Sequence, residues 1–205
     1  MIRIGVLASG GGTNLQAIID ACERGDIDGS VVIVISDKAD AYSLVRARKR
    51  GIEAVSIPPE GTGREEHEKL VDATLQKARV DLVVLAGYMR ILTPWFINRY
   101  LGRMMNIHPA LLPSFGGKGM YGEHVHRAVI EYGCKLSGCT VHFVVPEVDG
   151  GPIIIQESVP VLEEDTPDSL ASRIHPLEHK LYPKAIALFA SGKLKIEGRR
   201  VRIID

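Results

Sequence analysis

The sequence predicts an α/β fold with a mostly parallel central sheet, helices on both faces and an antiparallel C-terminal portion. Three observations lead to this prediction. Continuous runs of valine and isoleucine, which are typical of strands buried on both faces, alternate with segments of helical periodicity. Three glycines, Gly10 to Gly12, join the first such strand to the first helix. In the last third, two longer strands are joined through Asp149-Gly150-Gly151, as antiparallel neighbours are.

The N-terminal half, residues 1–108, is expected to alternate strands with helices. Apolar residues at 2–8 predict the first strand, and the helical spacing of Leu15, Ile18 and Cys22 predicts a helix over 14–24. Further strands are predicted at 30–36, 53–57, 81–86 and 104–107, with helices at 40–50, 64–79 and 94–98. The helix over 64–79 is expected to pack five side chains against the core: Leu70, Val71, Thr74, Leu75 and Ala78.

The C-terminal half, residues 109–205, begins with a loop rich in glycine and proline and a helix that ends near Gly133. Strands are predicted at 139–145 and 153–161, followed by a helix over 167–191 and two short strands. The chain has no internal repeat, low-complexity tract or linker. We therefore expect a single domain over 1–205.

The composition narrows the class of protein. Lys plus Arg and Asp plus Glu each number 25, and this balance weighs against a large nucleic-acid partner. No signal-type segment opens the chain, and no apolar run approaches the roughly 20 residues that cross a bilayer. The three cysteines lack metal-type or disulfide-type spacing. We expect a cytoplasmic protein, monomer or homodimer, that acts on small molecules without a metal.

The glycine run reads as a phosphate-binding loop. Free N–H groups at a helix N-terminus bind phosphate well, and glycines allow its close approach. Capping of the helix by Thr13 or Asn14 is the plainer interpretation. Three consecutive glycines exceed what capping requires, so we favour a phosphate on a mononucleotide-like ligand.

Other nucleotide-binding patterns fit less well. The dinucleotide fingerprint needs a third glycine where Leu15 stands, although Asp37 after the second strand keeps an NAD-binding oxidoreductase open. No Gly-Lys-Ser/Thr sequence occurs, which argues against a P-loop. Residues 117–122 match G-x-G-x-x-G but follow a loop rather than a strand, and we interpret that match as chance.

Asn106, His108 and Asp149 are the candidate catalytic residues. Asn106 and His108 lie two apart at the end of an apolar strand, so their side chains should share one side. An amide donor beside an imidazole can polarise a carbonyl and move a proton. A carboxylate such as Asp149, if the fold brought it alongside, would raise the pKa of the imidazole. This set suits acyl or formyl transfer without a metal.

Weaker candidates surround this set. Apolar residues flank Arg90 and could line a ring-shaped pocket, and Arg64 begins a helix, where a cation favours an anionic partner. Composition alone makes Glu178 a surface carboxylate. His175 and His179 are four apart, but Pro176 intervenes and no third ligand is evident, so a zinc site is not expected.

Several motifs in order resemble one family. They are Ser9-Gly10-Gly11-Gly12-Thr13-Asn14-Leu15, Leu85-Ala86-Gly87-Tyr88-Met89-Arg90, Asn106-Ile107-His108-Pro109, Gly138-Cys139-Thr140-Val141-His142-Phe143 with Asp149-Gly150-Gly151, and Glu178-His179-Lys180-Leu181-Tyr182-Pro183. Together they resemble the phosphoribosylglycinamide formyltransferases, folate-dependent enzymes of de novo purine synthesis. The resemblance covers essentially the whole chain and implies their Rossmann-like formyltransferase fold.

The resemblance also implies where two substrates bind. The phosphate of 5′-phosphoribosyl glycinamide would lie on Gly12, Thr13 and Asn14, with Glu178 near the sugar. The formyl donor, 10-formyltetrahydrofolate, would lie against these residues: Arg64, Met89, Arg90, Ile91, Leu92, Asn106, Val145 and Asp149.

The same resemblance implies catalytic roles. Asn106 would donate to the developing oxyanion, and His108 would manage protons as N10 of the folate leaves. Asp149 would keep His108 protonated when needed and orient a bridging water.

Alternatives remain at this point. Methionyl-tRNA formyltransferase would need a further C-terminal tRNA-binding domain, and formyltetrahydrofolate hydrolase a further N-terminal regulatory domain; neither is expected in this chain. A non-catalytic nucleotide-binding module would tolerate His108→Ala without losing any activity.

Overall fold

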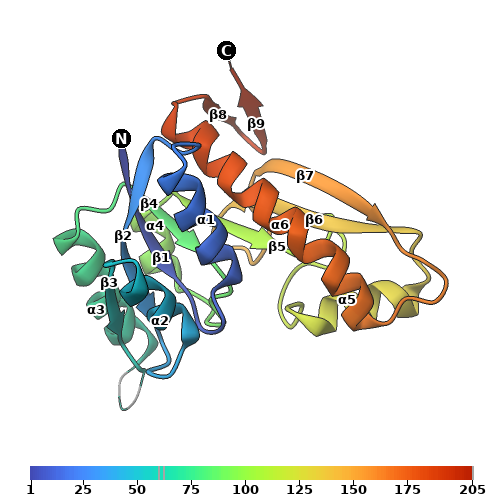
Figure 1. Ribbon diagram of the computed structural model, residues 1–205, viewed down its shortest axis with the longest axis horizontal. Helices are drawn as coiled ribbons and strands as arrows, with labels where there is room; N and C mark the ends of the chain where they lie inside the picture. The colour runs from blue at the N-terminus through green and yellow to red at the C-terminus, as the bar shows by residue number, and fades with distance from the viewer. Residues whose placement is uncertain (60, 62, 205) are drawn as a thin grey trace.

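A single nine-stranded sheet organises the molecule. The computed structural model describes residues 1–59, 61 and 63–204, and within these residues the strand order is β3-β2-β1-β4-β5-β6-β7-β9-β8. Figure 1 shows the sheet running from the N-terminal portion on the left into the C-terminal portion on the right. Both sequence halves therefore contribute to one sheet.

The first five strands are parallel and alternate with helices. The strands are β1 (Ile2–Leu7), β2 (Gly29–Ser36), β3 (Glu53–Ser56), β4 (Leu82–Leu85) and β5 (Met104–His108). The helices between them are α1 (Thr13–Glu23), α2 (Tyr42–Lys49), α3 (Arg64–Lys77) and α4 (Pro94–Arg99). β1 pairs in parallel with both β2 and β4, and β4 pairs in parallel with β5. The predicted parallel portion is confirmed.

The remaining elements continue the sheet with a change of direction. They are α5 (Glu123–Tyr132), β6 (Leu136–Phe143), β7 (Ile153–Pro160), α6 (Pro167–Ala190), β8 (Leu194–Glu197) and β9 (Arg200–Ile203). β6 pairs antiparallel with β5 and β7, which confirms the predicted antiparallel portion. β9 joins β7 in parallel through Ile153 and Arg200, and forms an antiparallel hairpin with β8. β6 lies about two residues earlier in the chain than predicted.

Two apolar clusters cover the two faces of the sheet. Alternate residues of one strand enter different clusters, because successive side chains of a strand point to opposite faces: Val6 belongs to one and Leu7 to the other. The first cluster includes residues of α1, α2, α5 and α6, and the second includes residues of α3 and α4. Figure 1 shows α1 and α6 in front of the sheet. Among the described residues, no helix is long and apolar enough to cross a membrane.

The buried face of α3 differs from the prediction. Leu70 is 53% exposed, and Thr74 and Ala78 are only partly buried. Three polar residues, His67, Glu68 and Asp72, are buried in their place beside Val71 and Leu75. The reason is a set of hydrogen bonds that hydropathy does not register. Asp72 accepts one from the hydroxyl of Tyr100 in the segment that follows α4.

Candidate active site

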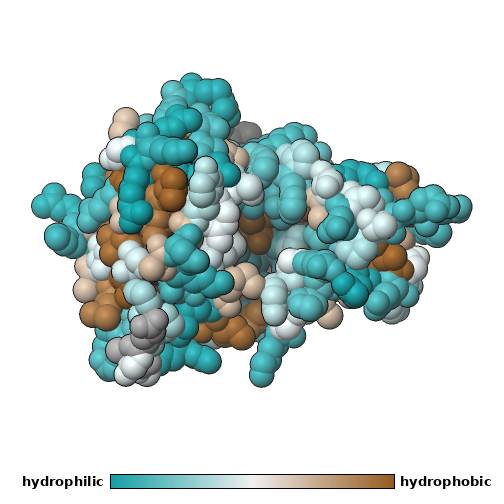
Figure 2. All heavy atoms as spheres, turned by 60° about the horizontal axis from the view of Figure 1, so that its bottom comes forward, coloured by the Kyte–Doolittle hydropathy of each residue, from teal (hydrophilic) through white to brown (hydrophobic). Residues whose placement is uncertain are grey.

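A cavity lies where the parallel strands end. It has a volume of about 420 Å³ and is lined by the first two residues of α1, the segment after β4, the end of β5, the loop after β6 and part of α6. Ligands of open α/β sheets bind at this carboxyl rim. Figure 2 brings the bottom of Figure 1 forward and shows hydrophobic residues in the recess between the broad N-terminal portion and the narrower C-terminal one.

His108, the last residue of β5, is held through one ring nitrogen. Its side chain is almost fully buried, and its Nε2–H donates to the carbonyl of Phe115 at 2.7 Å. A carbonyl can only accept, so neutral His108 carries its proton on Nε2 and its lone pair on Nδ1. Nδ1 lies 3.6 Å from Oδ2 of Asp149. The nitrogen available for proton transfer is therefore the one that faces the carboxylate.

Asp149 lies between two imidazoles. Its Oδ2 accepts a hydrogen bond of 2.9 Å from the backbone N–H of Gly117, and its Oδ1 lies 3.7 Å from Nε2 of His142. The backbone of Asp149 has φ of 54°, a left-handed conformation that is uncommon for a residue other than glycine. Such conformations gather at functional sites. The expectation that the fold brings Asp149 alongside His108 is met.

His142 is a site residue that the sequence reasoning missed. Its Nδ1–H donates to the carbonyl of Phe143 at 3.0 Å, which leaves Nε2 to accept from Nδ2 of Asn106 at 3.3 Å. Burial lowers the pKa of His142, so the neutral form is favoured. Only the strand pairing could have pointed to His142, because it places His142 opposite Asn106 in the β5–β6 ladder. That register is not visible from either strand alone.

The glycine loop leaves the N-terminus of α1 open. Gly12 is the N-cap residue with φ of 70°, and no side chain caps the helix, so the capping interpretation of Thr13 and Asn14 is wrong. A Cβ on Gly12 would lie 2.8 Å from Cβ of Ser43. Glycine is thus required by both the backbone conformation and the available space. The free N–H groups of this turn suit a phosphate.

Glu178 is buried beside this loop. Only 6% of it is exposed, so the surface position expected from composition is wrong. Its Oε2 accepts a hydrogen bond of 3.2 Å from Nδ2 of Asn14. Burial raises the pKa of Glu178 to about 7, and the bond from Asn14 lowers it by less. The contact between α1 and α6 that buries Glu178 joins distant parts of the chain.

The opposite side of the cavity is more apolar. Met89, Ile91, Leu92 and Val145 line it together with Arg90, as the resemblance implies. Met89 and Ile91 are each more than 40% exposed, which is unusual for large apolar side chains that have no partner. The cavity therefore has the uncapped N-terminus of α1 on one side, a polar set of amide, imidazole and carboxylate between, and an apolar wall on the other.

Comparison with known proteins identifies the family. Residues 2–186 match the family described as formyl transferase. The chain belongs to the formyl transferase family. Phosphoribosylglycinamide formyltransferase of Escherichia coli is 45% identical over 196 residues, 95% of this chain and 90% of its own. The Haemophilus influenzae protein of the same name is 46% identical over 96% of this chain and 91% of its own.

A solved structure agrees with this assignment. Glycinamide ribonucleotide transformylase 1 from Symbiobacterium toebii superposes with a TM-score of 0.95 at 53% identity, covering 100% of this formyl transferase and 95% of the other chain. The mostly parallel sheet with antiparallel C-terminal strands is thus the fold of the family.

Two expectations about this formyl transferase need adjustment. Arg64 is exposed at the N-terminus of α3 and is not among the residues that line the cavity, so its contact with a ligand stays a prediction. Residues 117–122, whose G-x-G-x-x-G match was interpreted as chance, do line the cavity, and Gly117 binds Asp149. Residues 117–122 follow a loop and not a strand, so they do not form a dinucleotide fingerprint. They contribute to the site by lining the cavity and by bonding Asp149.

Histidines gather in the site of this formyl transferase without forming a metal site. His126 and His175 also line the cavity, and burial lowers the pKa of His126 to about 4. Among the described residues, no group of three or more His, Cys, Asp or Glu side chains is arranged to hold a metal ion.

Proposed function

We propose that this chain transfers the formyl group of 10-formyltetrahydrofolate to the amine of 5′-phosphoribosyl glycinamide. The products are the N-formyl ribonucleotide and tetrahydrofolate. One observation carries the proposal: Asn106, His108 and Asp149 line one cavity, with the uncapped N-terminus of α1 at one side and an apolar wall at the other. The names of the Escherichia coli and Haemophilus influenzae relatives favour this substrate over other formyl acceptors.

The phosphoribosyl part fits the polar side of the cavity. We assign its phosphate to the N–H groups of Gly12, Thr13 and Asn14, where the helix dipole also favours an anion. Glu178, the buried carboxylate behind Asn14, is assigned to the sugar hydroxyls. The sugar hydroxyls would donate hydrogen bonds to the Glu178 carboxylate in place of the water that it loses on burial.

The folate fits the apolar side. A flat pteridine ring matches Met89, Ile91 and Leu92, and Arg90 suits a polar or anionic edge. Val145 lines the facing loop of the cavity. Arg64 is retained as a folate contact by resemblance alone.

The chemistry follows from the central residues. The substrate amine attacks the formyl carbon, a C–N bond forms, and the oxyanion receives a hydrogen bond from Nδ2 of Asn106, whose second N–H is not needed by His142. The bond to N10 of the folate then breaks. Nδ1 of His108 takes the proton lost by the attacking nitrogen and returns it to N10, so atoms and charge balance.

Asp149 supports this proton transfer. Its carboxylate stabilises the imidazolium form of His108 during turnover, and Nε2 of His108 stays bonded to Phe115 throughout. The neutral form of His142 keeps a second positive charge out of the site. The monomeric or dimeric state and a cytoplasmic location remain predictions.

The test is a transfer assay with purified protein and both substrates. We expect tetrahydrofolate to form only when 5′-phosphoribosyl glycinamide is present, together with one formylated ribonucleotide per folate. Formation of tetrahydrofolate and formate without the amine would favour the hydrolase alternative. Absence of both reactions, or unchanged turnover in His108→Ala, would contradict the proposal.

A further inference from the structure

The segment 87–93, which forms the apolar wall of the cavity, is fixed at both ends by side chains from elsewhere in the fold. At its start, the N–H of Met89 donates to Oγ of Ser9 at 2.9 Å. At its end, Thr93 is bonded to Glu68, a residue of α3. The segment itself has no strand or helix structure, so these bonds determine where its apolar side chains lie.

Glu68 binds Thr93 through both carboxylate oxygens. Oε1 accepts from the N–H of Thr93 at 2.8 Å, and Oε2 accepts from its hydroxyl. Thr93 is also the N-cap residue of α4, and its Oγ1 accepts from the N–H of Phe96 at 3.4 Å. Leu92, the neighbour of Thr93, and Ile97 in α4 both line the cavity. Thr93 therefore lies between two residues of the apolar wall and is bonded to the helix that carries one of them.

The burial of Glu68 needs a reason beyond helix capping. Only 2% of Glu68 is exposed, and among the described residues no Lys, Arg or His side chain forms an ion pair with it. A buried carboxylate without a cation is costly unless strong hydrogen bonds replace its water. Thr93 alone already supplies the usual cap of α4. The remaining effect of Glu68 is to hold Thr93 in one position.

The phosphate-binding side of the cavity is supported from a different helix. The backbone N–H of Ser43 donates to the carbonyl of Gly10 at 3.0 Å, and Nε of Arg46 donates to that of Gly11 at 2.7 Å. Both residues belong to α2, whose buried residues join the first apolar cluster, whereas those of α3 join the second. Ser9 does link the start of segment 87–93 to the glycine loop, but Glu68 acts at the opposite end of the segment, through Thr93. A change at Glu68 should therefore affect the apolar side of the cavity more than the side formed by the glycine loop.

We propose that Glu68 is a positioning residue for the formyl donor: through Thr93 it sets the position of segment 87–93 and so the affinity for the folate. This inference rests on the proposed function. It assigns to Glu68 an effect on folate binding that is separate from binding of the phosphoribosyl substrate and from the chemical step.

Glu68→Gln tests it, because the amide keeps the shape of the carboxylate and removes one of its two acceptors. We expect the KM for 10-formyltetrahydrofolate to rise about three- to tenfold, the range of one typical hydrogen bond. The KM for 5′-phosphoribosyl glycinamide and kcat should stay within about twofold. Calorimetric titration with tetrahydrofolate should show the same loss of affinity without turnover.

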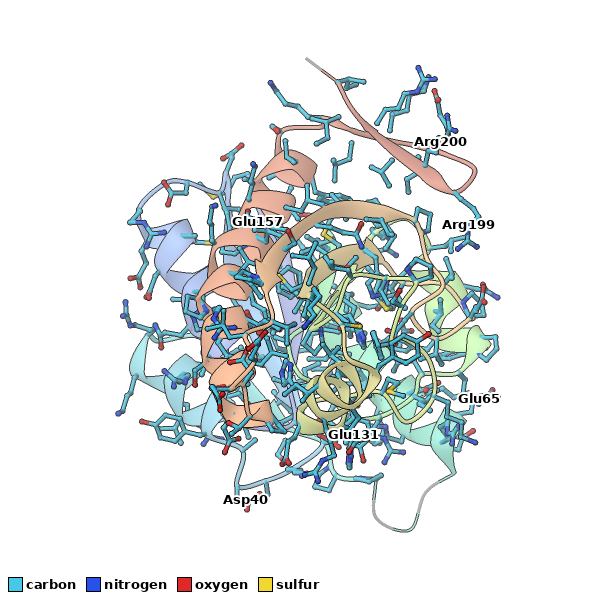
Figure 3. All side chains as sticks on the ribbon, turned by 90° about the vertical axis from the view of Figure 1, so that its right-hand side faces the viewer. Asp40, Glu65, Glu131, Glu157, Arg199 and Arg200 are labelled. Atoms are coloured by element: carbon cyan, nitrogen blue, oxygen red, sulfur yellow. The ribbon has the colours of Figure 1, made fainter. Side chains whose placement is uncertain are left out.

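Matched variants separate an effect on the position of segment 87–93 from a general effect on the stability of the fold. Glu65→Gln changes an exposed carboxylate of the same helix, labelled in Figure 3, and should leave both KM values unchanged. Thr93→Val removes the hydroxyl and should reproduce Glu68→Gln, whereas Thr93→Ser retains it and should restore wild-type folate affinity. Melting temperatures report any general effect on folding.

The outcomes distinguish the two proposals. If the wild-type protein neither transfers formyl groups nor binds tetrahydrofolate, the proposed function fails and this inference fails with it. If the wild-type protein is active but Glu68→Gln leaves the folate KM unchanged, or raises both KM values equally, only the positioning role is wrong. A lower melting temperature with unchanged folate binding would also overturn it.

Discussion

The carboxylate of Asp149 lies 3.6 Å from Nδ1 of His108, although one residue ends β5 and the other belongs to the loop between β6 and β7. Antiparallel pairing of β5 with β6 brings His142 opposite Asn106, and the loop after β6 then returns over the same residues. Gly117 adds a backbone N–H to the carboxylate, so the acid is held from two directions. The pairing of His108 with Asp149 is thus a product of strand order rather than of local sequence.

Removing the charge of Asp149 should reduce turnover far more than stability. In Asp149→Asn the side chain keeps an oxygen for the N–H of Gly117 but no longer stabilises imidazolium at His108. We expect kcat to fall about 10²- to 10⁴-fold, the usual contribution of general acid–base catalysis. Steady-state kinetics and thermal unfolding measure the two effects. Glu163→Gln, at an exposed position before α6, is the control, and equal kcat values for both variants would show that Asp149 has no catalytic role.

Asn106→Ala should affect the transition state more than substrate binding. The variant loses the Nδ2 donor assigned to the oxyanion and leaves Nε2 of His142 without its partner. Loss of one oxyanion donor typically lowers kcat by about 10²- to 10³-fold. We expect KM values for both substrates to change by only a few fold. A rise in KM at constant kcat would mean that Asn106 binds the ground state and the transition state equally well.

The sequence predicts the parts of the site that depend on local periodicity. Asn106 and His108 share a side because a strand has a period of two, and the glycine run opens α1 because a left-handed turn needs glycine. His142 and Glu178 were missed or misplaced for the opposite reason. The role of His142 depends on its register with β5, and the burial of Glu178 on packing of α6 against α1. Both contacts join residues that are far apart in the sequence, so no local pattern of residues predicts them.

The buried face of α3 illustrates the same limit. Hydropathy places Leu70 inside, yet Glu68 and Asp72 are buried, because Thr93 and Tyr100 supply hydrogen bonds to their carboxylates. These partners lie beyond the next strand. Polar side chains become good core residues only once such partners are known.

Two glycines of the turn before α1, to which we assign the phosphate, should respond differently to alanine. Gly12→Ala places a methyl group 2.8 Å from Cβ of Ser43 in a left-handed backbone, whereas a Cβ on Gly10 meets nothing within 4 Å. We expect Gly12→Ala to lose about 1–3 kcal/mol of stability and to raise the KM for 5′-phosphoribosyl glycinamide. Gly10→Ala is the matched control, and denaturant unfolding with steady-state kinetics compares them. Equal behaviour of the two variants would show that the turn adapts to a side chain.

Glu178 should make stability depend on pH in an unusual direction. Its pKa is raised from 4.5 to about 7 by burial, so between these values the folded protein keeps a proton that the unfolded chain releases. The free energy of unfolding contributed by this group therefore falls as pH rises through that window. Above pH 7 the raised pKa of Glu178 lowers the free energy of unfolding by about 3 kcal/mol, and below pH 4.5 it has no effect.

Glu178→Gln removes this titration while keeping an oxygen for Nδ2 of Asn14. We expect the variant to match the wild-type stability near pH 4.5 and to exceed it by up to about 3 kcal/mol at pH 8. Urea unfolding at several pH values between 4.5 and 8 measures this difference. Glu163→Gln should show none. The stabilised variant should nevertheless bind 5′-phosphoribosyl glycinamide more weakly, because an amide accepts sugar hydroxyls less strongly than a carboxylate. A stability difference that does not change with pH would mean that Glu178 does not titrate in this range.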